Sequence, residues 1–216
     1  MSMFYIIIFC SNYSCVLYKM KLLELFSGTK SVGKVAEKLG YEVVSLDLNN
    51  ADINCNIIDW DYTTYPVGYF DLIWASPPCT EYSKAKTVGV RNLELANEIV
   101  NRTIEIINYL KPMYYMIENP QTGLLKEQLF MNDFPYVDID YCKYGMPYRK
   151  RTRIWNNVFQ WKPQPLCKKD CNSMNGNKHI GSCGNGRALY TDKPYSIQDK
   201  YKIPHELINE LFKCIG

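Results

Sequence analysis

The chain has 216 residues, of which 47% are hydrophobic and 22% are charged, and its formal net charge is +3. These values are typical of one soluble globular domain with a small appendage, and they exclude a fibrous or largely disordered chain. Nine cysteines in a chain of this length do not indicate a disulfide framework, so we expect a reducing, intracellular compartment.

The charge is unevenly distributed along the chain. Residues 21–141 carry 10 Lys/Arg and 17 Asp/Glu, a net charge of −7, whereas residues 142–187 carry 10 Lys/Arg and only Asp170, a net charge of +9. An acidic body with a basic end is typical of a protein that docks a polyanion on one side.

The first 19 residues contain one apolar run, residues 4–10, which is shorter than the roughly 20 residues needed to span a bilayer. No basic region precedes the run and no small-residue cleavage site follows it, so neither a membrane contact nor a secretory signal is expected. Because Met20 directly precedes the first regular motif, we interpret residues 1–19 as an N-terminal extension without catalytic function, with an added strand as the alternative.

Residues 21–26 have the apolar pattern of a strand and lead into the turn Ser27-Gly28-Thr29, after which helical spacing continues to Gly40. A second strand, 42–46, ends at Asp47, where a carboxylate can accept hydrogen bonds from ribose hydroxyls. This strand–turn–helix–strand unit, which ends at Asp47, indicates a binding site for a nucleoside cofactor. Only one glycine stands in the turn, so a strand–helix unit without a nucleotide is the alternative.

Further strands alternate with helical segments, which predicts an α/β fold with a doubly wound, mostly parallel sheet. In the last of these strands, Asp138 and Asp140 are expected to alternate outward. An apolar stripe at helical spacing runs from Leu93 to Leu110 and is closed by Pro112. The further strands are predicted at residues 52–59, 70–74, 114–117 and 136–141.

The strand at 70–74 leads into Ser76-Pro77-Pro78-Cys79, which places Cys79 at the carboxyl end of the strand, where open α/β sheets carry their chemistry. The two prolines restrict the backbone before the thiol. A rigidly presented cysteine indicates a nucleophile, and a buried structural thiol is the alternative.

The strand at 114–117 delivers Glu118-Asn119-Pro120 to the same sheet edge if the two strands are parallel neighbours. Beside a nucleophilic cysteine, Glu118 is a candidate acid, because burial raises the pKa of a carboxyl towards neutrality. Otherwise it is a loop residue or a helix cap.

Between Met20 and the C-terminus, five short blocks resemble motifs of the cytosine-5 DNA methyltransferases, and they occur in the order typical of that family. Their sequences are most similar to those of the short phage- and virus-type branch. The blocks are Phe26-Ser27-Gly28, Asp47, Pro78-Cys79-Thr80-Glu81-Tyr82-Ser83, Glu118-Asn119-Pro120, and Tyr144-Gly145-Met146-Pro147 leading into Arg151-Thr152-Arg153. The resemblance implies a Rossmann-like fold, S-adenosyl-L-methionine as methyl donor, and double-stranded DNA with a flipped cytosine as substrate.

The resemblance also implies roles for single residues. Cys79 adds to carbon 6 of cytosine, Glu118 protonates ring nitrogen 3, and Arg151 or, preferably, Arg153 holds the O2 side of the ring. Asn119 and Pro78 support this pocket. Cofactor contacts are implied for Phe26, Ser27, Gly28, Thr29, Asp47 and Pro77, with the adenine at Asn56 and Ile57 or at Asp59 and Trp60.

Several positions depart from the family pattern. Thr80 replaces the usual glutamine, Pro120 replaces the usual valine, and Arg149 stands where a glutamine is usual, with one residue more after Pro147. The usual C-terminal Gly-Asn-x-Val-x-Pro segment is missing, and residues 201–204 followed by a helical pattern are its weak counterpart.

These blocks divide the chain into the extension, a catalytic domain at 20–157, a basic target-recognition segment at 158–194, and a C-terminal return at 195–216. In the basic segment, Cys167, Cys171, His179 and Cys183 have zinc-compatible spacing, with free cysteines on a loop as the alternative. The lysines Lys168, Lys169 and Lys178, with Arg187, are interpreted as phosphate contacts, and a solvated charged face is the alternative.

Three other functions remain open. Ser76-Pro77-Pro78-Cys79 also resembles the Ser-Pro-Pro-aromatic signature of enzymes that methylate exocyclic amino groups, with Cys79 at the aromatic position. The second alternative is an RNA-directed cytosine methyltransferase. The third is an inactive, cofactor-dependent DNA-binding protein. A monomer is expected in each case.

Overall fold

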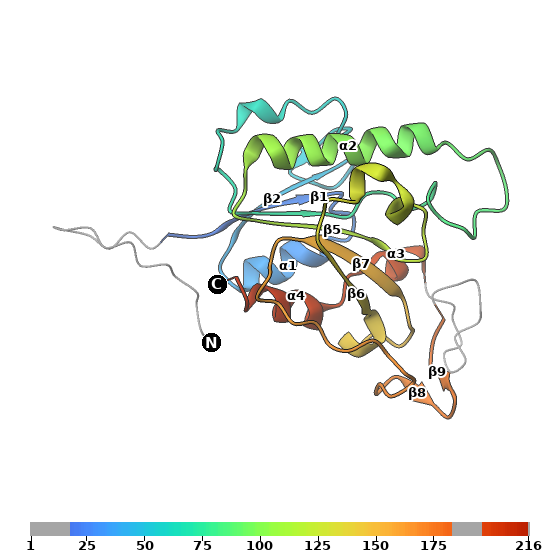
Figure 1. The fold of residues 1–216 in the computed structure, drawn as a ribbon. Helices are drawn as coiled ribbons and strands as arrows, with labels where there is room; N and C mark the ends of the chain where they lie inside the picture. The colour runs from blue at the N-terminus through green and yellow to red at the C-terminus, as the bar shows by residue number, and fades with distance from the viewer. Residues whose placement is uncertain (1–17, 183–195, 216) are drawn as a thin grey trace.

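The computed structural model describes residues 18–182 and 196–215, and a seven-stranded sheet is its centre (Figure 1). The strand order is β3-β2-β1-β4-β5-β7-β6. The strands are β1 (Lys21–Leu25), β2 (Glu42–Asp47), β3 (Ile53–Asn54), β4 (Leu72–Ala75), β5 (Tyr114–Pro120), β6 (Tyr136–Asp140) and β7 (Arg151–Asn156). The predicted α/β class with a doubly wound, mostly parallel sheet is confirmed.

Strands β3, β2, β1, β4 and β5 are parallel, and Leu25 of β1 lies opposite both Leu46 of β2 and Ala75 of β4. The chain moves outward from β1 through β2 to β3 and then returns to β4 on the other side of β1. The loops after β1 and β4 therefore diverge at the carboxyl edge of the sheet, which is where such sheets bind ligands.

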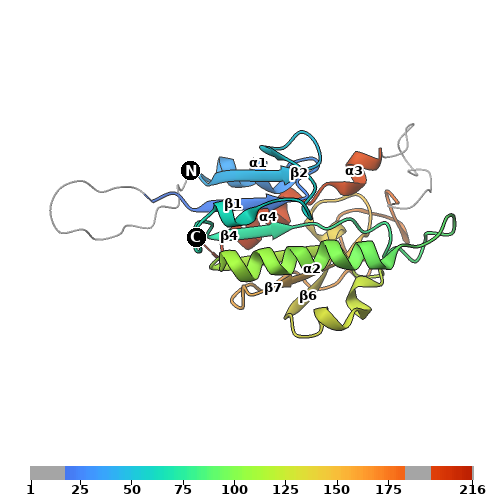
Figure 2. The ribbon, with the colours of Figure 1, turned by 90° about the horizontal axis from the view of Figure 1, so that it is seen from above.

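Helices cover both faces of the sheet, as Figures 1 and 2 show: α2 (Leu93–Leu110) lies on one face, and α1 (Ser31–Lys38) and α4 (His205–Phe212) lie on the other. Successive residues of β1 divide between these layers. Leu22 packs in the cluster that contains α1 and α4, and Leu23 packs in the cluster that contains α2. Because both faces are buried, the strand sequences are nearly continuous apolar runs.

Two expectations for the strands were wrong in detail, and one strand was not expected. The strand expected at 52–59 is only β3, because residues 56–59 form a turn closed by the Asp59 N–H donating to the Asn56 carbonyl at 3.0 Å. The Arg-Thr-Arg block was not predicted as a strand, yet it forms β7, which runs antiparallel between β5 and β6. Asp138 and Asp140 do not alternate outward: each lies directly opposite an arginine of β7, and Asp140 is only 1% exposed.

The segment after β7 packs back against α4 at the C-terminal end of the chain. Trp161 donates from Nε1 to Glu210 Oε1 of α4 at 2.9 Å, and Gln160 donates to the Cys214 carbonyl at 2.7 Å. The short strands β8 (Met174–Asn175) and β9 (Lys178–His179) form a hairpin, and α3 (Ile197–Tyr201) precedes α4. The helical pattern expected after residues 201–204 is confirmed by α4.

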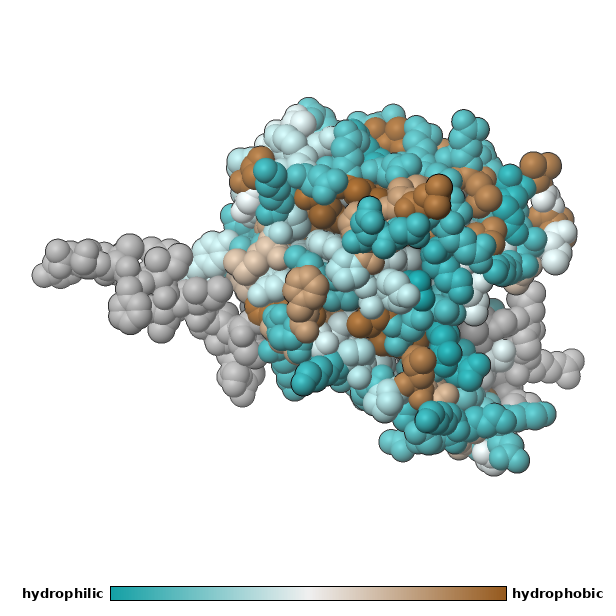
Figure 3. Space-filling view, viewed as in Figure 1, coloured by the Kyte–Doolittle hydropathy of each residue, from teal (hydrophilic) through white to brown (hydrophobic). Residues whose placement is uncertain are grey.

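Near the N-terminus, the Tyr18 hydroxyl donates to Asp71 at 2.8 Å, and residues 1–17 of the expected extension lie outside the described part of the chain. Within residues 18–182 and 196–215, no helix has the length and apolar character of a bilayer span. Polar side chains cover most of the face in Figure 3, with apolar ones scattered between them.

Candidate active site

The loops at the carboxyl edge of the sheet enclose a pocket of about 350 Å³. It brings together ten residues that the sequence had singled out. They are Phe26, Ser27, Gly28, Thr29, Asp47, Pro77, Pro78, Cys79, Glu118 and Asn119. The cofactor turn and the proposed nucleophile therefore share one cavity, as the parallel register of β1, β4 and β5 requires.

The turn after β1 has an unusual backbone. Phe26, Gly28 and Lys30 have φ angles of 59°, 47° and 53°. These lie in the left-handed region, which residues other than glycine rarely adopt. Lys30 stands where a second glycine would be expected, and its backbone has the conformation that favours one. Such strained positions persist where the surrounding structure holds them, and they cluster at ligand sites.

Asp47 organises this turn. Its carboxylate accepts from the Gly28 N–H at 2.8 Å and from the Leu48 N–H at 2.7 Å. Nearby, the buried Ser27 hydroxyl has no hydrogen-bond partner among the described residues, although it lines the pocket. A ligand with hydroxyl groups fits this arrangement, because carboxylate oxygens accept from hydroxyls and a buried hydroxyl requires a partner.

Glu24 is a pocket residue that was missed, and it lies at the N-terminus of α1. It is 3% exposed and accepts from the N–H groups of Val32 and Gly33 at 3.2 and 3.0 Å. Burial raises the pKa of Glu24 to about 7, and the two N–H groups partly oppose this rise. A charged residue inside the apolar run of β1 was the signal that could have identified it.

The Pro77-Pro78-Cys79 loop is fixed by its neighbours on both sides. The Ser76 N–H donates to the Leu25 carbonyl at 3.3 Å, and the buried Asn119 side chain donates from Nδ2 to the Pro77 carbonyl at 2.9 Å. The prolines supply no N–H and need no partner for one. Asn119 therefore holds the loop that carries Cys79.

The charge environment of Cys79 contains one opposing pair. Burial raises the pKa of the Cys79 thiol, the negative charge of Glu118 raises it further, and the positive charge of Lys150 lowers it. Lys150 Nζ lies 3.6 Å from Glu118 Oε1, and the Tyr141 hydroxyl donates to the same oxygen at 2.8 Å. Among the residues that line the pocket, Lys150 is thus the cation. Its carboxylate partner, Glu118, is only 6% exposed.

The two arginines expected at the substrate do not line the pocket. Arg151 pairs with Asp140 through Nη2 at 2.7 Å, and Arg153 pairs with Asp138 through Nε at 2.7 Å. Both are bidentate, cross-strand pairs that join β7 to β6.

The expected adenine contacts also lie outside the lining of this pocket. Asn56 and Asp59 belong to the turn after β3, and Ile57 is 3% exposed in the cluster beneath α2. The residues of the pocket that were not predicted as site residues are Glu24, Ser31, Ser76, Thr80, Pro120, Lys150, Tyr201 and Ile203. Tyr201 and Ile203 belong to the C-terminal segment at 195–216. They were not predicted because this segment matches the family pattern only weakly.

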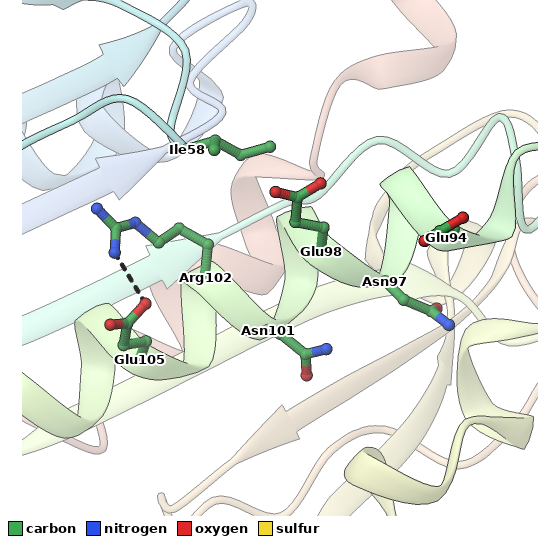
Figure 4. Close-up of a pocket in the computed structure, with 7 residues that line it drawn as sticks. All are labelled: Ile58, Glu94, Asn97, Glu98, Asn101, Arg102 and Glu105. Carbon is green, nitrogen blue, oxygen red and sulfur yellow. Dashed lines mark hydrogen bonds and ion pairs between the residues drawn. The ribbon is translucent and has the colours of Figure 1, made fainter.

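A second hollow, of about 1050 Å³, runs along the outer side of α2 (Figure 4). Its charged residues are Glu94, Glu98 and Glu105 with Arg102, and Arg102 pairs with Glu105 at 2.8 Å. The surplus of carboxylates disfavours a polyanion, and the hollow holds no nucleophile. It shares no residue with the pocket at the sheet edge.

The structure brings three of the four candidate zinc ligands together with one further cysteine. Cys142, Cys167, Cys171 and His179 each offer one ligand atom, and all four atoms lie within 4.8 Å of one another. Three of these were expected from the sequence. The fourth expected ligand, Cys183, lies outside the described residues. The fourth member of the cluster among the described residues is Cys142, from the 3₁₀ helix η4 (Tyr141–Tyr144).

The chain is similar to a probable DNA (cytosine-5)-methyltransferase of Frog virus 3 (isolate Goorha), with 35% identity over 214 positions that cover 89% of this chain and 98% of the relative. No family model matches. Two solved structures are similar: a DNMT2 mutant of Spodoptera frugiperda (TM-score 0.46, 18% identity, 70% of this chain) and the methyltransferase EhMeth of Entamoeba histolytica (TM-score 0.48, 17% identity, 69%). The match spans 56% of the length of each solved structure.

Proposed function

The chain belongs to the DNA (cytosine-5)-methyltransferase family, and on that premise we propose that it methylates carbon 5 of cytosine in DNA through a covalent adduct on Cys79. The observation that carries this proposal is the shared pocket. Cys79 and Glu118 lie in it with the Phe26 turn and Asp47, so a nucleophile, an acid and a nucleoside site face one cavity.

The nucleoside site fits S-adenosyl-L-methionine, which would supply an electrophilic methyl group. Asp47 would accept from the ribose hydroxyls, the Ser27 hydroxyl would gain its missing partner, and Phe26 would pack on the ligand. Glu24 adds a buried carboxyl to the same wall. A carboxylate there suits the positive charge of this methyl donor, because opposite charges attract strongly in a pocket of low dielectric.

The chemistry of Cys79 follows from the weak nucleophilicity of carbon 5 of cytosine. The thiolate forms a bond to carbon 6, and the electrons of the double bond move to carbon 5, which then takes the methyl group. Glu118 donates a proton to ring nitrogen 3, so that negative charge does not accumulate during addition. A base, such as a water molecule, then takes the proton from carbon 5, which expels the Cys79 thiolate, and ring nitrogen 3 returns its proton to Glu118, so that the ring is restored.

Lys150 is assigned the cationic role in this pocket in place of Arg151 and Arg153. Its charge favours the Cys79 thiolate, and its ammonium can donate to an acceptor on the base. The two arginines are instead engaged with Asp140 and Asp138. They act as supports that hold β7, and with it the neighbouring Lys150, to β6.

A cytosine stacked inside a duplex cannot bring its ring carbons to the Cys79 thiol in this pocket, so the base is flipped out of the stack. The basic region after residue 142 then binds the phosphates, and residues 158–194 act as the small target-recognition segment. Residues 20–157 supply the catalytic body, and 195–216 complete the pocket through Tyr201 and Ile203. This division of the chain is part of the proposal.

The test is methyl transfer from a labelled donor to DNA and to RNA of the same sequence, followed by digestion to nucleosides. The proposal predicts 5-methylcytosine from DNA. Label in N4-methylcytosine or N6-methyladenine would establish amino-group chemistry instead, and label in RNA alone would assign a different substrate. A Cys55→Ala variant, which changes another free cysteine, is the matched control for Cys79→Ala.

A further inference from the structure

The cysteine–histidine cluster has the composition of a structural zinc site. Cys142 is 3% exposed and Cys167 is 5% exposed, and both are free thiols, as is Cys171. With His179 they offer three sulfur atoms and one ring nitrogen within 4.8 Å of one another. Three cysteines and one histidine around a tetrahedral ion form a closed site, without a position for substrate.

We propose that Cys142, Cys167, Cys171 and His179 bind one Zn²⁺, and that this ion fixes the basic segment to the catalytic body. Three of the ligands belong to the segment, at Cys167, Cys171 and the hairpin strand β9. The fourth, Cys142, belongs to η4, which directly follows β6 of the central sheet. The ion therefore joins two parts of the chain that are separated by the whole of β7.

The local backbone is arranged around the sulfur of Cys167. The Lys169 N–H donates to Cys167 Sγ at 3.3 Å, and Lys169 has a φ of 68°, in the left-handed region. His179 presents Nε2 to the same sulfur at 3.5 Å. A turn that directs an N–H towards a ligand sulfur is a supporting contact that orients metal ligands.

The segment needs such a fixed point because it has little apolar core. Strands β8 and β9 have two residues each, and four neighbouring residues, from Asn175 to Lys178, are exposed. A part this small and polar cannot be stable through burial alone, and metal binding supplies folding free energy directly.

The ion would also act on the active site through three consecutive residues. Asp140 accepts from the Cys167 N–H at 2.9 Å and pairs with Arg151, Tyr141 donates to Glu118 at 2.8 Å, and Cys142 is a ligand. A fixed Cys142 holds η4, and η4 begins with the tyrosine that donates to the proposed acid. Tyr141 is thus a positioning residue between the metal and Glu118.

The first experiment measures zinc in the purified full-length protein by mass spectrometry. We expect about one zinc per chain, and loss of it in Cys142→Ser and Cys171→Ser. Cys214→Ser is the matched control, since Cys214 is a free cysteine outside the cluster, and it should keep the metal. Cys183→Ser should also keep it. Absence of zinc from the wild type would overturn the proposal, and so would retention in Cys142→Ser with loss in Cys183→Ser.

A second measurement does not depend on whether these variants fold. X-ray absorption at the zinc edge of the wild-type protein should show three sulfur atoms at about 2.3 Å and one nitrogen at about 2.0 Å. Two sulfur atoms, or a shell of oxygen and nitrogen only, would contradict the ligand set. Removal of the metal by a chelator should lower Tm, and an unchanged Tm would exclude a structural role.

Discussion

At the scale of single residues, the central feature is the opposition of charges around Cys79. The thiol must lose its proton to act, yet burial and Glu118 both raise its pKa. The positive charge of Lys150 lowers the pKa, as does a backbone hydrogen bond, and Lys150 lies 3.6 Å from the carboxylate that raises it. In the proposed mechanism, the pocket therefore balances a nucleophile that needs a nearby cation against an acid whose ionised form disfavours the thiolate.

Replacing Lys150 tests this balance. Lys150→Ala removes the charge that lowers the pKa of Cys79, so the pKa should rise and less thiolate should be present at neutral pH. We expect the pH midpoint of Cys79 alkylation to move upward, and methyl transfer at pH 7 to fall by up to about tenfold for each unit by which the pKa of the thiol rises. Peptide mass spectrometry after iodoacetamide treatment at a series of pH values measures the midpoint.

Lys150→Arg provides the rescue, because it retains the positive charge. Alkylation of Cys214 in the same samples is the internal control. An unchanged Cys79 midpoint in Lys150→Ala would show that Lys150 does not control the thiol.

At the scale of elements, the contact between β1 and α1 is unusually close. Glu24 receives two N–H groups from the first turn of α1, where the helix dipole also favours a carboxylate. The helix comes this near because Gly33 has no side chain. An added Cβ would lie 2.6 Å from Glu24 Oε2 and 3.2 Å from Val43 Cγ1.

Gly33→Ala should therefore destabilise the protein, although alanine is the better helix former. Glu24 is buried and held at both oxygens, so it cannot move away without losing its partners. We expect a net loss of about 1–3 kcal/mol in the free energy of unfolding, from overpacking, measured by urea denaturation. Lys38→Ala, on the exposed end of the same helix, should change it by less than about 0.5 kcal/mol. Equal stability of Gly33→Ala and wild type would refute this account of the contact.

The elements also show where prediction from the sequence succeeded. Strands β1, β2, β4 and β5 and helices α1 and α2 were recognisable because their apolar runs and helical spacings are local properties. Their parallel order then placed Cys79 and Glu118 at one edge. The blocks that resemble the methyltransferases identified ten of the pocket residues.

The remaining features depend on contacts between distant residues. The first three residues of β7 are polar, and pairing with Asp140 and Asp138 makes Arg151 and Arg153 suitable for a strand. Cys142 lies 25 residues before Cys167, so a search for closely spaced ligand pairs preferred Cys183. Lys150 could not be distinguished from its neighbours by sequence. The structure shows that Arg151 and Arg153 are paired with Asp140 and Asp138, whereas Lys150 lines the pocket.

At the scale of the whole molecule, the charge differs between two parts of the chain: residues 21–141 are acidic and residues 142–187 are basic. Lys168 and Lys178 are exposed on the hairpin region, where the sequence predicts contacts to phosphate. We expect the double variant Lys168→Ala/Lys178→Ala to bind duplex DNA more weakly, because each lost phosphate contact removes one released counterion. The slope of log K against log salt should fall by about 0.9 for each contact, measured by fluorescence anisotropy.

Cofactor affinity should be unchanged in this variant, because neither lysine lines the pocket. Lys38→Ala, a lysine exposed on α1, is the matched control for the loss of positive charge. An unaltered salt slope in the double variant would place the DNA elsewhere on the molecule.

The central claim is that one pocket supports a covalent addition by Cys79, and trapping the adduct tests it most directly. Duplex DNA that carries 5-fluorocytosine is incubated with the protein and the methyl donor, and fluorine at carbon 5 prevents the elimination that would release the thiol. The account predicts a species with the mass of chain, oligonucleotide and one methyl group, joined at Cys79, in wild type and Cys55→Ala but not in Cys79→Ala. No adduct in the wild type, or an adduct that persists in Cys79→Ala, would contradict it.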